Sequence, residues 1–294
     1  MKQTVAIISA LFFMLALPCR LFAVQKHALV IGVGLQKDES WGRINVNMDV
    51  ECVCKILHQY KFNDIVVIRD KDATKAGIVS GMKELAERCN PGDAVYVHFS
   101  GHGQQMTDVD GDEPEDGMDE SWIPYDAFLR YCREDDGSRH LCDDEINGLL
   151  SAVRERIGEK GCLLVVVDAC HSGGSTRDGD ADAELPTYRG SDKVFELPSC
   201  GTGRCPSAGV ITEDWLVLSA CEDYQVNWEM KDPKVGKLTW CLYQLRDVLD
   251  SMSNDELLDA VTCLMESPQM LSPLPQNPRL EGSDGRYQIM DLFR

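Results

Sequence analysis

The sequence is poor in positive charge and in long hydrophobic runs. It carries 29 Lys and Arg residues against 49 Asp and Glu residues, a formal net charge of -20 at pH 7. Such a surface repels nucleic acid and anionic membranes, so we expect neither as a partner. It is compatible with cationic substrates, with divalent cations, or with a simple solvated acidic surface. Beyond residue 23 no apolar run approaches the ~20 residues of a membrane span, which predicts no stable membrane insertion of the mature protein.

The one long apolar run lies at the N-terminus. Lys2 is followed by an apolar stretch over residues 5–17, and Leu-Phe-Ala at residues 21–23 is typical of a cleavage site. We therefore predict a signal peptide over residues 1–23 and an exported protein, periplasmic or secreted. A cleaved signal is favoured over a lipid anchor because Pro18 precedes Cys19. Residues 24–294 show no internal repeat and are expected to form a single domain and a monomer.

Strand and helix patterns alternate along the mature chain. Short β-branched runs predict strands, and apolar residues at helical spacing predict helices. Such alternation is typical of an α/β fold, with helices on both faces of a mainly parallel central sheet, here of about six strands. The expected strands lie at residues 27–34, 65–68, 94–100, 162–168 and 215–221. The expected helices lie at residues 49–60, 74–88, 143–156 and 238–249 and from residue 253, where Ser253 and Glu256 form a capping box.

The periodic pattern disappears between Gly174 and Val210. A stretch of this length without periodicity is usually functional or disordered, and we expect a flexible loop over about residues 175–209. Its basic residues are candidate cleavage points in an exposed loop. They are Arg177, Arg189, Lys193 and Arg204.

A buried strand that ends in an acid, a thiol and an imidazole carries the strongest chemical signal. The apolar run over residues 163–167 leads into Asp168, Cys170 and His171, followed by Ser-Gly-Gly. Ligands of open α/β sheets bind at the carboxyl ends of strands, and small residues let a substrate backbone approach. We predict that Cys170 is a nucleophile. The alternative is a buried structural cysteine before a turn.

A second predicted strand, residues 94–100, ends in the same manner. His102 follows it between two glycines. A cysteine thiol is mostly protonated at neutral pH, so a nucleophilic Cys170 needs a nearby base, and His102 is the candidate. His171 is set aside as the base because neighbouring side chains on an extended chain point apart.

Together these two motifs resemble the caspase-like peptidases of clan CD, and most of all the metacaspases and their bacterial relatives. The likeness rests on Ser-Gly-His-Gly at residues 100–103 and Asp-Ala-Cys-His-Ser-Gly at residues 168–173. A weaker likeness extends from about Lys26 to about Gly282. The resemblance implies a caspase-like fold and a cysteine endopeptidase with a His-Cys dyad.

A carboxylate beside the nucleophile bears on specificity. Asp168 lies two residues before Cys170, so both side chains face the same side of an extended segment, and Asp168 would pair with a substrate Arg or Lys. In metacaspases the matching residue forms the pocket for a basic side chain, and Asp49 and Ser100 match further pocket positions. The alternatives are that backbone amides satisfy Asp168 and that Asp49 is a helix N-cap.

Two further predictions concern the cleft. The backbone N–H groups of Cys170 and Gly103 are the natural donors to an oxyanion. The segment with Trp228 and Glu229 resembles one that lines the substrate cleft in the family, although Trp228 could equally be a core residue.

The acidic run over residues 108–120 suggests a calcium site. It is not an EF-hand, because Glu113 replaces the required glycine and no helix flanks the run. It resembles instead the Asp-rich hairpin that many metacaspases couple to calcium activation; the alternative is a solvated acidic loop. The residues that match calcium positions are Asp119, Asp143 and Asp144. After the nucleophile, where the family has another ligand, this chain has Arg177 and Asp178.

Thirteen cysteines are many for an exported protein. Without Cys19 and Cys170 an odd number is left, so at least one cannot pair within the chain. Cys200 and Cys205 could close a small disulfide, whereas Cys52 and Cys54 on one helix would not face each other. Zinc is not expected, because no closely spaced Cys or His doublet recurs.

The leading hypothesis is an exported cysteine endopeptidase that acts on proteins or peptides with basic residues and cleaves after Arg or Lys. It would require no cofactor for its chemistry, would be stimulated by calcium, and would process itself within residues 176–208. One alternative is a catalytically silent caspase-like binding or scaffold module. Another is a hydrolase or transpeptidase of a different clan CD type.

Overall fold

The computed structural model describes residues 24–108, 117–170, 187–198, 214–222, 224–282 and 285–294. The predicted signal peptide, most of the acidic run, and His171, Arg177, Asp178, Cys200 and Cys205 lie outside these residues. Within them, no helix is both long and apolar enough to cross a membrane.

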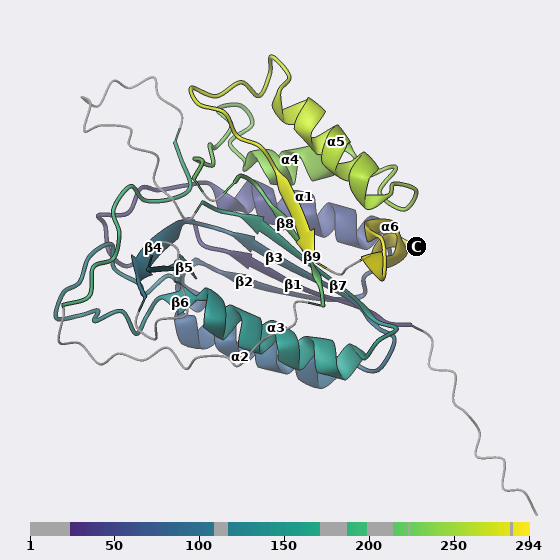
Figure 1. Ribbon diagram of the computed structural model, residues 1–294, viewed down its shortest axis with the longest axis horizontal. Helices are drawn as coiled ribbons and strands as arrows, with labels where there is room; N and C mark the ends of the chain where they lie inside the picture. Colours follow the sequence, from purple (N-terminus) through teal and green to yellow (C-terminus); the bar gives the residue numbers. More distant parts are fainter. Residues whose placement is uncertain (1–23, 109–116, 171–186, 199–213, 223, 283–284) are drawn as a thin grey trace, which may run out of the picture.

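A six-stranded sheet forms the centre of the molecule (Figure 1). Its order is β2-β1-β3-β7-β8-β9, and every pair is parallel except β8 with β9. Parallel neighbours need crossover connections, and helices supply them except between β7 and β8, where no helix lies among the described residues. The strands are β1 (Lys26–Gly32), β2 (Asp64–Arg69), β3 (Ala94–Ser100), β7 (Cys162–Asp168), β8 (Leu216–Ser219) and β9 (Arg279–Gly282).

Helices cover both faces of this sheet (Figure 1). One layer consists of α1 (Val46–Gln59), α4 (Lys237–Gln244), α5 (Asn254–Met265) and α6 (Ile289–Phe293), and the other of α2 (Lys75–Arg88) and α3 (Asp143–Ile157). The central strands are apolar on both sides: Val166 belongs to the core beneath the first layer, and Val165 and Val167 to the core beneath the second. Continuous β-branched runs follow from this double burial.

The predicted α/β fold class, with a mainly parallel six-stranded sheet, is confirmed. β3 and β7 have the predicted bounds, and Thr74 caps α2 by accepting a hydrogen bond from the Gly77 N–H. The Ser253–Glu256 capping box is present. The alternative role of Asp49 as a helix N-cap is wrong, because α1 begins earlier and Asn45 caps it.

A second, smaller sheet follows His102. It consists of β4 (Gly103–Thr107), β5 (Met118–Trp122) and β6 (Leu141–Cys142), all antiparallel, with β4 at one edge. Strand periodicity did not predict β4, β5 or β6, because strands of two to five residues carry too little pattern. Their position next to the carboxyl ends of β3 and β7 makes them part of the surroundings of the site.

Most cysteines of the described residues are free thiols. Cys142 is disulfide-bonded. Cys52 and Cys54 are both free, as their common helix led us to expect. The free cysteines are Cys52, Cys54, Cys89, Cys132, Cys162, Cys170, Cys221, Cys241 and Cys263.

Replacing Tyr287 by Phe tests how β7 is held. The buried Tyr287 hydroxyl donates to the Leu163 carbonyl at 2.6 Å and accepts from the Leu163 N–H at 3.1 Å. The variant leaves two buried main-chain groups unsatisfied, and we expect a loss of about 1–3 kcal/mol in the free energy of unfolding. Denaturant unfolding followed by circular dichroism measures it. The matched control is Tyr224→Phe at a position that is 75% exposed, and equal stability of the two variants would contradict the assignment.

Candidate active site

The register between β3 and β7 brings the two predicted motifs together. Ser100 is the partner of Asp168 in this parallel pair. His102 and Cys170 each follow two residues later, at the carboxyl ends of adjacent strands. Neighbouring strands lie roughly 5 Å apart, so the two motifs meet at the carboxyl ends of β3 and β7.

His102 is buried and held through one ring nitrogen. Its Nε2 lies 2.6 Å from the Gly42 carbonyl oxygen, which can only accept, so Nε2 carries the proton in the neutral ring. Trp41 stacks on the ring with centroids 5.1 Å apart. Nδ1 has no hydrogen-bond partner among the described residues. The ring therefore offers Nδ1 as a fixed, unprotonated acceptor.

The surroundings keep this imidazole neutral. Burial, opposed by the hydrogen bond to Gly42 and reinforced by the charge of Arg189, lowers the pKa of His102 to about 4. A histidine with this pKa is a proton acceptor across the neutral range.

Cys170 is buried, and its polar atoms face other parts of the chain. Its thiol donates a hydrogen bond to the Gln225 carbonyl at 2.6 Å, and its backbone N–H donates to the Arg189 carbonyl at 2.8 Å. Gly190 lies directly against it, since a Cβ at Gly190 would come within 2.7 Å of the Cys170 carbonyl oxygen and 3.1 Å of its Cβ. Only a residue without a side chain fits there unless the backbone shifts.

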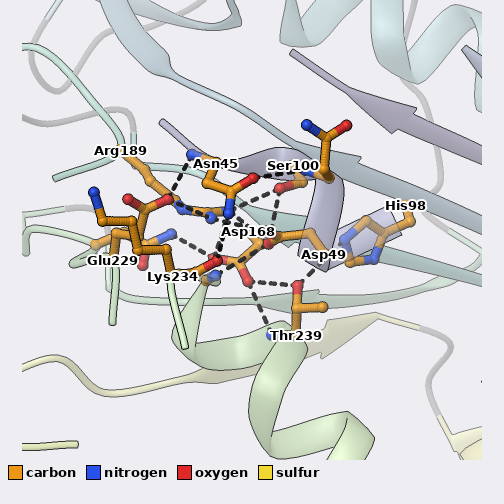
Figure 2. Close-up of polar contacts among 12 residues, drawn as sticks. Asn45, Asp49, His98, Ser100, Asp168, Arg189, Glu229, Lys234 and Thr239 are labelled. Atoms are coloured by element: carbon orange, nitrogen blue, oxygen red, sulfur yellow. Dashed lines mark hydrogen bonds and ion pairs between the residues drawn. The ribbon is translucent and has the colours of Figure 1, made fainter. Parts of the chain in front are cut away.

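The side chain of Arg189 lies among acidic side chains (Figure 2), and its backbone carbonyl contacts Cys170. Its guanidinium donates to both carboxylate oxygens of Asp49, at 2.7 Å from Nη1 and 3.0 Å from Nη2. Nη1 also donates to Ser100 at 2.7 Å, and Nη2 to Glu229 at 3.2 Å. The Arg189 side chain is fully buried. A two-pronged contact of this kind selects a planar guanidinium by shape as well as by charge.

Asp168 forms the inner wall of the same pocket. It accepts hydrogen bonds from Asn227 at 2.8 Å and from the backbone and hydroxyl of Thr239 at 2.9 and 2.6 Å, and it lies 3.8 Å from Nη1 of Arg189. Burial acts to raise the pKa of Asp168, but the Arg189 charge and these hydrogen bonds outweigh it and lower the pKa below its ordinary value. Asp168 is thus a fixed negative charge that accepts its hydrogen bonds from Asn227 and Thr239.

Glycine is required at the entrance of α4. A Cβ at Gly236 would come within 2.1 Å of Asp168 Oδ2, and the Gly236 N–H donates to Asp49 at 3.1 Å. The pocket holds three carboxylates, Asp49, Asp168 and Glu229, against one guanidinium. With Arg189 bound it keeps an excess of negative charge, which raises the pKa of the arginine despite the opposing effect of burial.

The residues before Arg189 add a strand to the cleft. The Arg189 N–H donates to the Asn227 carbonyl at 2.8 Å, and the Glu229 N–H donates to the Thr187 carbonyl at 2.7 Å. Tyr188 and Trp228 form an antiparallel bridge, and their rings meet edge to face with centroids 6.1 Å apart. Peptides bound by strand addition use this pattern.

The structure brings together most of the predicted site. His102, Cys170, Asp168, Asp49 and Ser100 all lie at one edge of the sheet. Of the predicted oxyanion donors, the Cys170 N–H contacts the Arg189 carbonyl, and Gly103 begins β4 directly after His102.

The predicted calcium residues lie on β5 and at the start of α3. Asp119 is buried on β5, and Asp143 and Asp144 begin α3. No group of three or more His, Cys, Asp or Glu side chains among the described residues could hold a metal ion.

Some site residues escaped prediction. Thr239 and Asn227 lack any distinguishing pattern, and Glu229 was noticed only through the resemblance. Among the basic residues of the predicted loop, nothing in the spacing distinguished Arg189. The available signal was the two-residue spacing between Asp168 and Cys170. It indicated a pocket for a basic side chain but did not show that Arg189 occupies it.

Comparison with known proteins agrees with this geometry. The family model of the metacaspase, peptidase C14 domain matches residues 26–177. The chain is similar to Metacaspase-2 of Arabidopsis thaliana, with 37% identity over 81% of this chain and 56% of that protein. It is similar to Metacaspase-1B of Aspergillus fumigatus, with 35% identity over 51% of this chain and 36% of that protein. The aligned region thus spans only about a third to a half of these relatives.

Solved structures share the fold. Caspase-1 from Spodoptera frugiperda matches 88% of this chain and 87% of its own, with a TM-score of 0.58 and 14% identity. A Geobacter sulfurreducens protein matches 87% of this chain and 92% of its own, with a TM-score of 0.63 and 23% identity. The fold is therefore caspase-like. Because the family model covers half of its length, the chain belongs to the metacaspase family of peptidase C14 domains.

The environment of His102 predicts an unusual titration. In the Cys170→Ala protein we expect the ring to stay neutral from pH 7 to pH 5 and to gain its proton near the pKa of about 4. Burial and Arg189 both disfavour the imidazolium, so Cys170→Ala/Arg189→Ala should titrate at higher pH, towards the ordinary value near 6.5.

Side-chain ¹⁵N NMR measures this titration. A His102→Gln spectrum assigns the signal against His98 and His140, whose pKa values burial lowers to about 4 and about 3. An ordinary titration with Arg189 in place would show that His102 is not buried in this way.

Proposed function

We propose that this protein is a cysteine endopeptidase that cleaves after Arg or Lys, with Cys170 as nucleophile and His102 as acid and base. The observation that carries the proposal is the state of Arg189. Its side chain lies in a pocket of three carboxylates, and its carbonyl oxygen accepts a hydrogen bond from the N–H of Cys170. These are the two contacts that a substrate residue needs on the acyl side of the cleaved bond.

The first step is acyl transfer. Nδ1 of His102 accepts the thiol proton, and Cys170 Sγ attacks the substrate carbonyl carbon, forming a C–S bond. The N–H of Cys170 stabilises the charge that develops on the carbonyl oxygen. His102 then donates its proton to the leaving nitrogen, and the C–N bond breaks. The products are a thioester on Cys170 and a free amine.

The second step is hydrolysis of the thioester. His102 accepts a proton from water while the water oxygen attacks the carbonyl carbon, and the C–S bond breaks. The thiolate recovers its proton from His102, and the acid product leaves. The pocket holds the basic side chain through both steps, so binding energy is used to orient the reacting bond.

The first substrate we propose is the chain itself, at the bond between Arg189 and Gly190. Four basic residues of the predicted loop were candidates, and the contacts of Arg189 support this one. Gly190 also supports it, since the residue after the cleaved bond lies against Cys170 with no room for a side chain. An Arg189 that fills the pocket also blocks other substrates until it leaves.

We expect the mature protein, residues 24–294, to cut itself and then to hydrolyse Arg-ending and Lys-ending fluorogenic peptides far better than Asp-ending ones. N-terminal sequencing should find a fragment that begins at Gly190. Cys170→Ala and Arg189→Gln should remain whole, whereas the control Lys193→Gln, which keeps Arg189, should be cut. Asp49→Asn weakens a charge-assisted contact, so its kcat/KM on Arg peptides should fall roughly 10- to 100-fold.

Three results would contradict the proposal: cleavage by Cys170→Ala at the original rate, a preference for Asp, or a fragment that begins elsewhere. A folded protein that neither cuts itself nor reacts with a cysteine-directed peptide probe would favour the alternative, a silent binding or scaffold module.

Calcium stimulation and export belong to the same proposal, supported by the sequence. No step above passes through a metal. If the acidic run and Asp119, Asp143 and Asp144 couple calcium to activity, self-cleavage should be faster in millimolar calcium than in EGTA. Asp143→Asn/Asp144→Asn should remove the difference. Equal rates in calcium and EGTA would disprove the coupling. For export, an N-terminus near residue 24 on protein recovered outside the cytoplasm is the corresponding measurement.

A further inference from the structure

The residues after Gly190 are bound to the small sheet. The Phe195 N–H donates to the Gln105 carbonyl at 2.8 Å, and the Thr107 N–H donates to the Phe195 carbonyl at 3.1 Å. Leu197 adds a bond from its N–H to the Thr107 hydroxyl at 3.2 Å. Met106 and Phe195 thus form a parallel bridge on β4, which is the edge strand of its sheet. The segment adds one short strand to that edge.

The Phe195 ring fills a socket on this edge. It is fully buried in a small cluster with Met106, Cys142 and Leu197. The His140 ring lies 4.2 Å away, centroid to centroid, and a Cβ at Gly137 would come within 3.4 Å of the Phe195 ring. This cluster is separate from the two cores that flank the central sheet. The ring therefore anchors its segment rather than the fold.

The anchor lies close to the bond that we propose is cut. Phe195 is the fifth residue after Gly190, and a fully extended chain of that length spans only roughly 17 Å. Between them, the Gln104 side chain donates to the Lys193 carbonyl at 2.7 Å. On the other side, residues 187–189 pair with residues 227–229. The chain is thus bound to the protein on both sides of the peptide bond between Arg189 and Gly190, before it by residues 227–229 and after it by β4.

We propose that Phe195 is a positioning residue for self-cleavage, and that the edge of β4 with its socket is the binding site for the peptide segment that follows the cut bond. This rests on the proposed function. Binding of Phe195 makes presentation of Arg189 intramolecular and raises its local concentration at Cys170. After the cut, the same socket keeps the new N-terminus at Gly190 on the enzyme. The ligand class is an extended peptide with an aromatic residue at the sixth position after the cut.

The experiment separates positioning from folding. In the mature protein, Phe195→Ala should slow self-cleavage at least tenfold on a denaturing gel, and Phe195→Tyr or Phe195→Leu should restore much of the rate. Peptide hydrolysis is then compared in Arg189→Ala and Arg189→Ala/Phe195→Ala, where no arginine blocks the pocket. With a substrate whose fluorophore directly follows Arg, the two kcat/KM values should agree within about twofold. Phe62→Leu, a buried aromatic of the main core, is the control for general destabilisation.

Each other outcome overturns the inference. Self-cleavage of Phe195→Ala at the original rate would show that the socket does not present the bond. A parallel fall in self-cleavage and in peptide hydrolysis would show that Phe195 only supports the fold. Failure of the proposed function looks different, because the unmodified protein would then fail to cleave both itself and the Arg peptide.

Discussion

The structure depends on how three buried carboxylates are neutralised at one edge of a sheet. Asp49, Asp168 and Glu229 share a pocket with a single guanidinium, and hydrogen bonds from Asn227, Thr239 and the Gly236 N–H take up part of the remaining charge. Carboxylates that are buried without such partners are costly. The buried carboxylates therefore need either a basic side chain or water in the pocket to offset their charge. This need makes the pocket selective for basic side chains.

Two parallel strands set the geometry around that pocket. Because Ser100 and Asp168 are partners in register, one residue type at each strand end supplies pocket chemistry and another, two residues later, supplies reactive chemistry. Side chains two residues apart face the same side of an extended chain, so the pocket residue and the reactive residue of each strand end lie next to each other. A shift of one residue in this register would turn both side chains to the opposite face, so the buried packing of both faces of β3 and β7 protects the site as well as the fold.

Much of this could be predicted from the sequence, and the reasons for the gaps are physical. Continuous apolar runs gave β3 and β7 their bounds, and offsets of two residues indicated His102, Cys170 and Asp168. Asp49 was assigned through resemblance, and the structure gives it the more direct contact with Arg189. Contacts made across the fold leave no local pattern, so the occupancy of the pocket by Arg189, the bonds of Thr239 to Asp168 and the socket of Phe195 were out of reach. The segment around Phe195 is aperiodic because it is held by a single bridge to β4 and by one buried ring, which is too short a contact to leave a periodic pattern.

The order of strands in the central sheet has a consequence for any cut near Arg189. β7 precedes that position and β8 follows it, yet the two strands are neighbours, and β9 lies outside β8. Asp49 and Asp168 come from the first piece of the chain, and Asn227, Glu229 and Thr239 from the second. A nicked molecule is therefore a two-chain protein with one shared pocket: its pieces separate on a denaturing gel, but each alone holds only half of the groups that recognise a basic side chain.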